Sequence, residues 1–269
     1  MHRSFFALTE TVAWLLNIGI EMKENVIVLT TGLSGSSVTT ALIAQGDFWL
    51  GKETIVKNNS TGQYDTYENL QLVNLNKQLY KSLDFTPTQD ALYDANVFEM
   101  FANCHDKVDT QEYEAFIKDC NENGAWLWKD PRLWNTIGFW LPLIKKHCGD
   151  SVKFVVLSRQ PLSLWVSLLL KRNIVNYDFL KKSEKASAER LAGYLSDENF
   201  KLCDLNYNDL LSHPESTIAN LNEFLGTSLT MTDMTNIFRG ELPAKPWKWK
   251  DLVKASLIYL KNRSEAKRS

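Results

Sequence analysis

Two polar segments of this chain carry groups that bind anions, and each comes directly after an apolar run. The run 26–30 leads into a segment rich in glycine, serine and threonine, 31–40. The run 152–157 leads into Arg159 and Pro161. Backbone N–H groups in a turn of small residues and the planar guanidinium of arginine both bind phosphate well. The two segments together would suit a nucleotide that carries phosphates at both ends of its ribose.

Segment 31–40 has the composition of a phosphate-binding turn. Small residues let the backbone approach a ligand closely, and the helix expected over 39–44 adds a partial positive charge of about +0.5 at its N-terminus. A nucleoside-triphosphatase loop is not predicted, because the lysine of the G-x-x-x-x-G-K-[ST] pattern is missing. A strand-to-helix corner without a ligand would have the same composition. The residues available to a phosphate are Gly32, Ser34, Gly35, Ser36, Ser37, Val38 and Thr39.

The second segment presents an arginine just before a helix that begins with proline. Arg159 keeps its charge at any working pH and can hold a phosphate through two parallel hydrogen bonds. At a spacing of four, it is followed by Ser163, Ser167 and Lys171 along the helix expected over 161–172. This polar track predicts a side that faces a ligand or, alternatively, the solvent-facing side of an amphipathic helix.

The order of apolar runs predicts an α/β fold, with a single three-layer α/β/α domain over 22–269 and a mainly parallel central sheet. Such sheets bind ligands at the carboxyl ends of their strands. The loop 32–37, Lys129 and Arg159 are therefore expected to converge on one crevice. A polar stretch, 57–66, is expected to be a loop. Strands are expected at 26–30, 47–50, 126–129, 152–157 and 201–206, and helices at 39–44, 68–83, 91–103, 111–123, 133–147, 161–172, 208–212 and 214–225.

The composition is that of an ordinary globular protein, and it argues against several classes. The 269 residues carry a net charge of −2, so nucleic-acid binding is not predicted. No apolar segment reaches the roughly 20 residues that a membrane span requires. The cysteines form no C-x-x-C pair, which suits free thiols in a reducing, cytoplasmic compartment. No His/Cys cluster has zinc spacing, so no metal is predicted.

The two ends of the chain differ from the part between them. Residues 1–21 are expected to be a dispensable helical extension rather than a secretory signal, because no small-residue cleavage site follows 5–20. The segment 245–269 holds eight Lys or Arg against two Asp or Glu, which predicts a solvated basic tail or a patch for an anionic ligand. Trp247 and Trp249 are expected to pack a terminal helix onto the domain or, alternatively, to line an acceptor site.

Taken together, these segments resemble the sulfotransferase family that uses 3′-phosphoadenylyl sulfate (PAPS). The family's first loop is similar to 32–39, and its Arg-x-Pro motif with a later serine is matched by Arg159, Pro161 and Ser167. Three further stretches are similar to bacterial members: Y-E-N-L at 67–70, W-K-D-P-R at 128–132 and Y-N-D-L-L at 207–211. The resemblance runs from about residue 26 to 226. It implies a P-loop-like α/β fold, PAPS as cosubstrate and adenosine 3′,5′-bisphosphate as product.

The resemblance also implies roles for single residues. Lys129 would place a positive charge near the bridging oxygen of the leaving group. Glu68 is the preferred general base, and His105 is the alternative. The acceptor would be a hydroxyl or amine of a carbohydrate, lipid, peptide or small molecule. The residues that would bind the nucleotide are those of the loop 32–39 together with Arg159, Ser167 and Tyr207.

One position departs from the family pattern. The basic residue of the family's first loop, which neutralises the phosphosulfate, aligns with Gly35. Either another cation replaces it, or the protein binds the nucleotide without efficient transfer. The alternatives to a sulfotransferase are therefore a catalytically silent nucleotide-binding protein of the same fold and a P-loop kinase, which the missing lysine disfavours.

Overall fold

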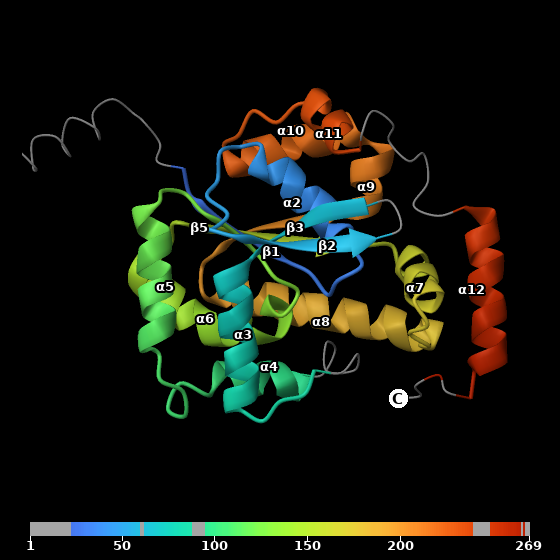
Figure 1. Ribbon diagram of the computed structural model, residues 1–269, viewed down its shortest axis with the longest axis horizontal. Coiled ribbons are helices and arrows are strands. Elements are labelled where there is room, and N and C mark those ends of the chain that lie inside the picture. The colour runs from blue at the N-terminus through green and yellow to red at the C-terminus, as the bar shows by residue number, and fades with distance from the viewer. Residues whose placement is uncertain (1–22, 60–61, 88–94, 239–247, 265, 267–269) are drawn as a thin grey trace, which may run out of the picture.

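The computed structural model describes residues 23–59, 62–87, 95–238, 248–264 and 266, so the extension expected at 1–21 lies outside the described residues. At its centre is a sheet of four parallel strands in the order β4-β1-β5-β6 (Figure 1). The strands are β1 (Asn25–Leu29), β4 (Leu127–Lys129), β5 (Val152–Ser158) and β6 (Lys201–Asn206). The expectation of an α/β fold with a mainly parallel central sheet is confirmed.

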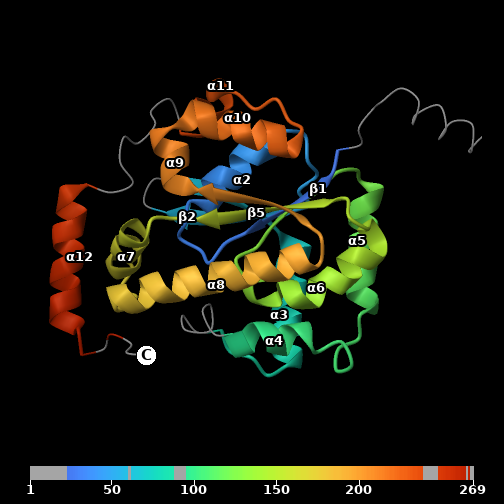
Figure 2. The same cartoon turned by 180° about the vertical axis from the view of Figure 1, so that it is seen from behind.

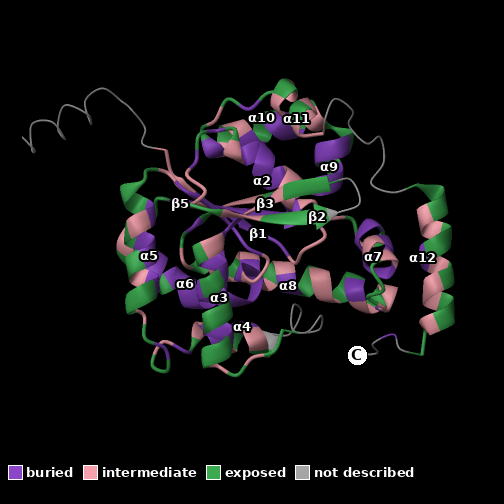
Figure 3. Cartoon of the chain, in the orientation of Figure 1, coloured by how far each residue is buried: buried purple, intermediate pink, exposed green. Residues whose placement is uncertain are grey.

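Helices cover both faces of this sheet, because its strands are apolar on both sides. In β1, Ile27 and Leu29 join one hydrophobic cluster while Val26 and Val28 join another on the opposite face. Figures 1 and 2 show the sheet between the two helical layers, and Figure 3 shows its buried strands. One layer contains α3 (Leu70–Ser82), α4 (Ala95–Ala102), α5 (Gln111–Glu122), α6 (Leu133–Cys148) and α8 (Tyr177–Asp197). The other contains α2 (Ser36–Ala44), α9 (Tyr207–Ser212), α10 (Pro214–Leu225) and α11 (Met231–Ile237).

Two further helices lie at one end of the molecule. Helix α7 (Pro161–Leu170) follows β5, and α12 (Trp249–Asn262) packs against α7 (Figures 1 and 2). Together with the start of α8 they form a third hydrophobic cluster. Among the helices within the described ranges, none combines the length and the apolarity that crossing a bilayer requires.

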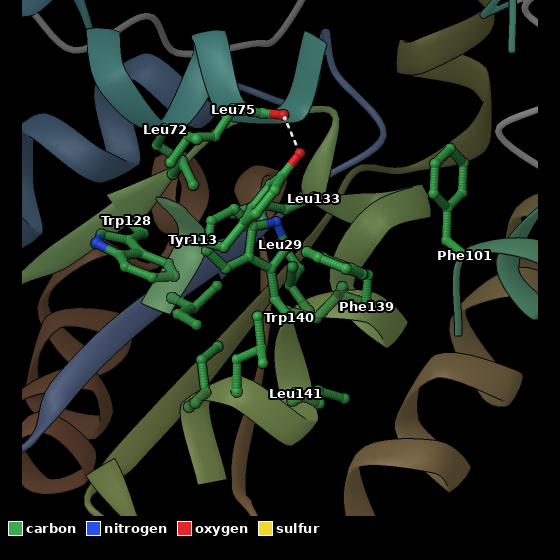
Figure 4. Packing of buried hydrophobic residues seen from close by; sticks show 14 of the residues in the cluster. Leu29, Leu72, Leu75, Phe101, Tyr113, Trp128, Leu133, Phe139, Trp140 and Leu141 are labelled. Carbon is green, nitrogen blue, oxygen red and sulfur yellow. Dashed lines mark hydrogen bonds between the residues drawn. The ribbon is translucent and has the colours of Figure 1, made fainter. Parts of the chain in front are cut away.

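Packed aromatic rings hold β4, the shortest strand of the sheet. Trp128 packs edge-on against Trp140 of α6, with ring centroids 5.3 Å apart. Tyr113 of α5 packs on the same Trp140 ring and donates its hydroxyl to the Leu75 carbonyl of α3, 3.4 Å away (Figure 4). Large rings in edge-to-face contact bury much apolar surface. This packing therefore fixes β4, and with it Lys129 at its end.

The expectation that 57–66 is a loop is wrong. The region belongs to a β-hairpin in which β2 (Thr54–Asn59) pairs with the antiparallel β3 (Gly62–Asn69). Its strands are mostly polar, so they lack the alternating apolar residues that indicate a strand. An isolated two-stranded hairpin is marginally stable in water. Here β3 also packs against α2 and β4, which supplies the missing support.

The start of α3 differs from the expected helix 68–83. Asn69 is the N-cap residue, and its side chain accepts hydrogen bonds from the N–H groups of Gln71 and Leu72. A capping asparagine of this kind begins a helix at the following residue. Glu68 therefore lies in β3 and does not cap the helix.

Other segments were not predicted, or were predicted in a different form. Helix α8 has a long, charged sequence whose buried positions are Leu180, Ser187, Leu191 and Leu195, a stripe too narrow to indicate a helix by pattern alone. Helix α11 was also not expected. The strand expected at 47–50 is reduced to one bridge between Trp49 and Trp126. The helix expected at 91–103 is described only from Ala95 onward.

Candidate functional site

The turn that follows β1 has the backbone of an anion-binding loop. Gly32, Leu33 and Gly35 all have positive φ, at 90°, 55° and 79°. Gly35 is the N-cap residue of α2, and no side chain caps that helix. The first N–H groups of an α-helix have no partner within the helix and attract negative charge. The loop and the uncapped start of α2 therefore leave backbone N–H groups without a partner within the helix.

Gly35 is required at its position by the ring of Tyr207. A Cβ atom added at Gly35 would lie 2.3 Å from two ring carbons of Tyr207, the first residue of α9. The positive φ of Gly35 is also one that other residues adopt only with strain. In the family that this chain resembles, a basic residue stands at this position. Here the space that a side chain at position 35 would need is occupied by the Tyr207 ring of α9.

Arg159 contacts the same loop from the neighbouring strand. Because β1 and β5 are parallel neighbours, their carboxyl ends lie side by side. The Arg159 Nη1 donates to the Leu33 carbonyl at 2.7 Å, and its guanidinium lies 5.7 Å from the centre of the Tyr207 ring. Burial lowers the pKa of Arg159, and the nearby Tyr207 opposes this effect. The two predicted anion-binding segments are therefore in direct contact.

The predicted polar track on α7 is not the solvent-facing side of that helix. Ser163 is buried, and its hydroxyl accepts a hydrogen bond from the Asn208 side chain at 3.2 Å. Ser167 is half-buried and donates to the Ser163 carbonyl at 3.0 Å. Lys171, at the end of the track, is exposed and lines the cavity described next. Only the last residue of this track, Lys171, is exposed.

A cavity of about 370 Å³ opens beside the loop, and it is called the loop cavity below. Three lysines line it, Lys57 from β2, Lys129 from β4 and Lys171 from the end of α7, together with the carboxylate of Glu68. Such a surplus of ammonium groups favours a ligand with several negative charges. Its lining residues are Gly32, Leu33, Gly35, Ser36, Ser37, Val38, Lys57, Tyr64, Thr66, Glu68, Lys129, Pro131 and Lys171.

Lys129 and Glu68 form a buried ion pair at the edge of this cavity. The Lys129 Nζ lies 2.8 Å from Glu68 Oε1 and also donates to the Thr66 carbonyl at 3.2 Å. The two residues are only 2% and 3% exposed. Burial lowers the pKa of Lys129 below its usual 10.5, and the attraction of Glu68 offsets part of this shift. The predicted cation and the predicted base are therefore direct partners.

An irregularity in the hairpin brings Glu68 to that position. The pairing of β2 and β3 shifts register between Thr54 and Val56, and Tyr67 has a φ of 57°. A β-bulge adds residues to one strand and redirects the side chains that follow. Thr66 and Glu68 are both buried here, next to the carboxyl end of β4.

A hydrogen-bonded network that the sequence analysis did not identify holds the turn after Lys129. Asn76 of α3 donates to Asp130 Oδ2 at 2.9 Å and accepts from the side chains of Thr136 and Trp140. Asp130 also accepts from the backbone and side chain of Arg132. Buried polar groups whose hydrogen bonds are all made favour a single arrangement of the core. The D-P-R sequence after Lys129, within the matched motif, is the signal that could have indicated this network.

A second cavity, of about 440 Å³, lies between α2, the hairpin and α11, and it is called the hairpin cavity below. It shares Ser37, Val38 and Tyr64 with the loop cavity, so the two are contiguous. Among the residues that the structure describes, Asp65 and Asp233 are its charged lining residues, and no lysine or arginine lines it. This cavity was not predicted, because the residues of the hairpin carry no strand pattern and 57–66 was expected to be a loop.

Several predicted residues do not line either of these cavities. Thr39 is fully buried, and Ser34 is hydrogen-bonded to Thr30 behind the loop. Arg159 and Tyr207 contact residues of the loop, and the Ser167 hydroxyl donates to the Ser163 carbonyl on α7. His105, the alternative base, stacks on Phe139 of α6 with ring centroids 4.7 Å apart, and burial lowers its pKa. Over the residues that the structure describes, no group of three or more His, Cys, Asp or Glu is placed to hold a metal.

Solved structures that align with this chain include several sulfotransferases. The sulfotransferase domain of the Synechococcus PCC 7002 olefin synthase is 13% identical, covers 90% of this chain and 96% of its own, and gives a TM-score of 0.49. The sulfotransferase domain from the curacin biosynthetic pathway is 15% identical, with 93% and 100% coverage and a TM-score of 0.46. Sulfotransferase STF9 from Mycobacterium avium is 11% identical, with 96% and 81% coverage and a TM-score of 0.40. No protein-family model and no curated protein matches the chain. At these identities and scores, no activity or cosubstrate carries over from these structures to this chain.

Proposed function

We propose that this protein is a sulfotransferase that moves a sulfuryl group from PAPS to a hydroxyl or amine of an acceptor. One observation carries the proposal. The loop after β1, Lys129 after β4 and Arg159 after β5 lie on three adjacent parallel strands, at the edge of the sheet where a cavity with three lysines opens. The motif order from residue 26 to 226 supports the same function.

In this proposal the loop cavity holds the phosphosulfate end of the nucleotide, and the ribose 3′-phosphate lies outside it, because neither Arg159 nor Ser167 lines the cavity. Backbone N–H groups of 35–38 bind the 5′-phosphate, since α2 begins there without a side-chain cap, whereas the N–H of Thr39 already donates to the Gly35 carbonyl at 3.0 Å. Arg159, with Ser167, binds the 3′-phosphate of the ribose. Tyr207 packs between Arg159 and Gly35 and so sets the spacing of the two phosphate sites. Lys57 and Lys171 supply positive charge that position 35 lacks.

The transfer itself is an in-line displacement. The acceptor oxygen or nitrogen forms a bond to sulfur while the bond from sulfur to the bridging phosphate oxygen breaks, and adenosine 3′,5′-bisphosphate leaves. Lys129 neutralises the charge that develops on the leaving oxygen. Within the described residues, the hydrogen bond from Lys129 and the ion pair with Lys57 both go to Glu68 Oε1, which leaves Oε2 to take the acceptor's proton. Positioning and charge provide most of the rate in such group transfers.

The acceptor would enter through the hairpin cavity. This cavity is contiguous with the loop cavity, so an acceptor in it would lie beside the sulfuryl group. Its two carboxylates, Asp65 and Asp233, disfavour an acceptor that is itself negatively charged. A carbohydrate, lipid, peptide or small molecule remains an acceptor class that this geometry allows.

A catalytically silent nucleotide-binding protein is the second candidate function. Gly35 favours it, because the loop lacks the basic residue that the resemblance leads one to expect. Calorimetry with adenosine 3′,5′-bisphosphate and with ATP tests nucleotide binding. We expect saturable binding of the bisphosphate, at least tenfold tighter than ATP, because ATP lacks the 3′-phosphate. Transfer of labelled sulfate from PAPS to an acceptor panel then separates the enzyme from the silent protein. Tighter binding of ATP would contradict both functions and favour a kinase.

Arg159→Ala is expected to weaken bisphosphate binding by about 1.5–3 kcal/mol, the scale of a lost charged hydrogen bond. The loss includes the contact of Arg159 with the Leu33 carbonyl, which holds the loop. Titration calorimetry measures the change, and Arg190→Ala on α8, another half-buried arginine, is the control. An unchanged affinity in the Arg159 variant would remove this residue from the nucleotide site.

A further inference from the structure

An apolar stripe runs along the outer side of α12. Trp249, Val253, Leu257 and Leu260 are 74%, 41%, 62% and 59% exposed. Their spacings of four, four and three residues place them on one face of the helix. Exposed large apolar residues are normal when scattered, but a contiguous patch marks a contact surface. This stripe therefore differs from an ordinary solvent-facing helix side.

The opposite side of α12 is fixed to the rest of the molecule. Ala255 is fully buried in the cluster with α7, and Tyr259 packs edge-on against Trp165 of α7 with ring centroids 5.5 Å apart. Tyr259 also accepts a hydrogen bond from the Asn176 side chain at 3.3 Å. The orientation of α12 is thus set by packing, and the stripe is exposed on a helix that lies at the edge of the molecule (Figures 1 and 3). The expectation that Trp249 packs onto the domain is wrong, and Trp247 lies outside the described residues.

A line of lysines borders the stripe. Lys250, Lys254 and Lys261 are exposed, and at 100° per residue they fall side by side next to the apolar face. No ion pair among the residues described involves any of the three. An apolar face next to a row of cations is the pattern of a helix that lies in the interface of an anionic bilayer.

We propose that α12 docks this protein flat on the surface of an anionic lipid bilayer. Its 14 residues extend about 21 Å at 1.5 Å per residue, too short to span a bilayer core of roughly 30 Å but suited to lying on one. A stripe one helix wide offers little area to a stable protein partner, whereas a bilayer needs no complementary shape. The tryptophan at its start suits the headgroup region. The proposal is independent of the sulfotransferase function.

Vesicle sedimentation tests the proposal on the whole protein. Vesicles of phosphatidylcholine with about 30% phosphatidylglycerol should bind it about a hundredfold more tightly than phosphatidylcholine vesicles, since each lysine near the surface contributes about fivefold. Raising the salt to 0.5 M should remove most of this difference. Brominated lipid should quench a component of the tryptophan emission that Trp249→Phe removes.

Two variants and one control separate the contributions. Leu257→Ser should weaken binding to anionic vesicles by about tenfold, and the triple variant K250E/K254E/K261E should abolish it. The control K77E/K81E/K118E makes the same charge change at exposed positions of α3 and α5 and should bind as the parent does. Equal binding of the parent to both kinds of vesicle would overturn the proposal. So would binding to soluble polyglutamate as tight as to the vesicles, or a dimer in solution that Leu257→Ser dissociates.

Discussion

Lys129→Met is expected to lower the free energy of unfolding by about 3–5 kcal/mol, because it leaves the Glu68 carboxylate buried without its ammonium partner. Lys57 remains 3.7 Å from Glu68 but is half exposed, so it replaces little of the lost interaction. Urea denaturation measures the change, and an unchanged m value would show that the same surface is exposed on unfolding.

The double variant Lys129→Met/Glu68→Gln separates stability from chemistry. It removes both charges, so we expect it to recover most of the lost stability. Sulfate transfer should remain about 100- to 1,000-fold below the parent, the usual effect of losing a group that stabilises developing charge. Affinity for adenosine 3′,5′-bisphosphate should change by less than about tenfold. Parental transfer by the double variant would contradict the catalytic roles, and a large loss of affinity with unchanged turnover would make Lys129 a nucleotide-binding residue.

Gly35→Ala is expected to destabilise the protein by about 2–4 kcal/mol. The added Cβ meets the Tyr207 ring at 2.3 Å, which costs the energy of overpacking, and alanine at a φ of 79° adds a backbone penalty. Bisphosphate affinity should fall as well, because the loop and the start of α2 must move. Thermal denaturation and calorimetry measure the two effects.

Gly226→Ala is the matched control for this change. Gly226 has a similar backbone, with φ 68° and ψ 40°, but a Cβ there meets nothing within 4 Å. Gly226→Ala should lower the free energy of unfolding only by the backbone penalty, about 1 kcal/mol. The double variant Gly35→Ala/Tyr207→Ala should lose less stability than the sum of its single changes, because the ring contact is gone. Equal effects of the two glycine variants would show that Tyr207 does not dictate the glycine.

The central sheet could be predicted because its strands are continuous apolar runs. The runs 26–30 and 152–157 are observed as β1 and β5 within a residue or two, since a strand buried on both faces needs no polar alternation. The groups at their carboxyl ends are brought together because the strands are parallel neighbours. The sequence does not show which strands pair. The structure shows that β1 and β5 are parallel neighbours.

The hairpin could not be predicted because its residues carry no strand pattern. The polar residues 57–59 and 62–66 form strands only where β3 packs on α2 and β4, which are distant in the sequence. With the hairpin missing, the hairpin cavity, the position of Glu68 in β3 and its ion pair with Lys129 were not predicted. The long helix α8 was missed for a similar reason, because a narrow apolar stripe among charged residues suffices once a large surface lies beneath it.

By itself, the amino-acid sequence determined the strands of the central sheet, most of the helices around it and the kinds of group at the strand ends, because apolar periodicity and small-residue turns act locally. Tertiary structure alone decided which of those groups touch. It paired Lys129 with Glu68, placed the Tyr207 ring against Gly35, joined Arg159 to the loop and turned the apolar stripe of α12 outward. These contacts join residues far apart in the chain, and their energy depends on burial and distance, which no local pattern of residues records.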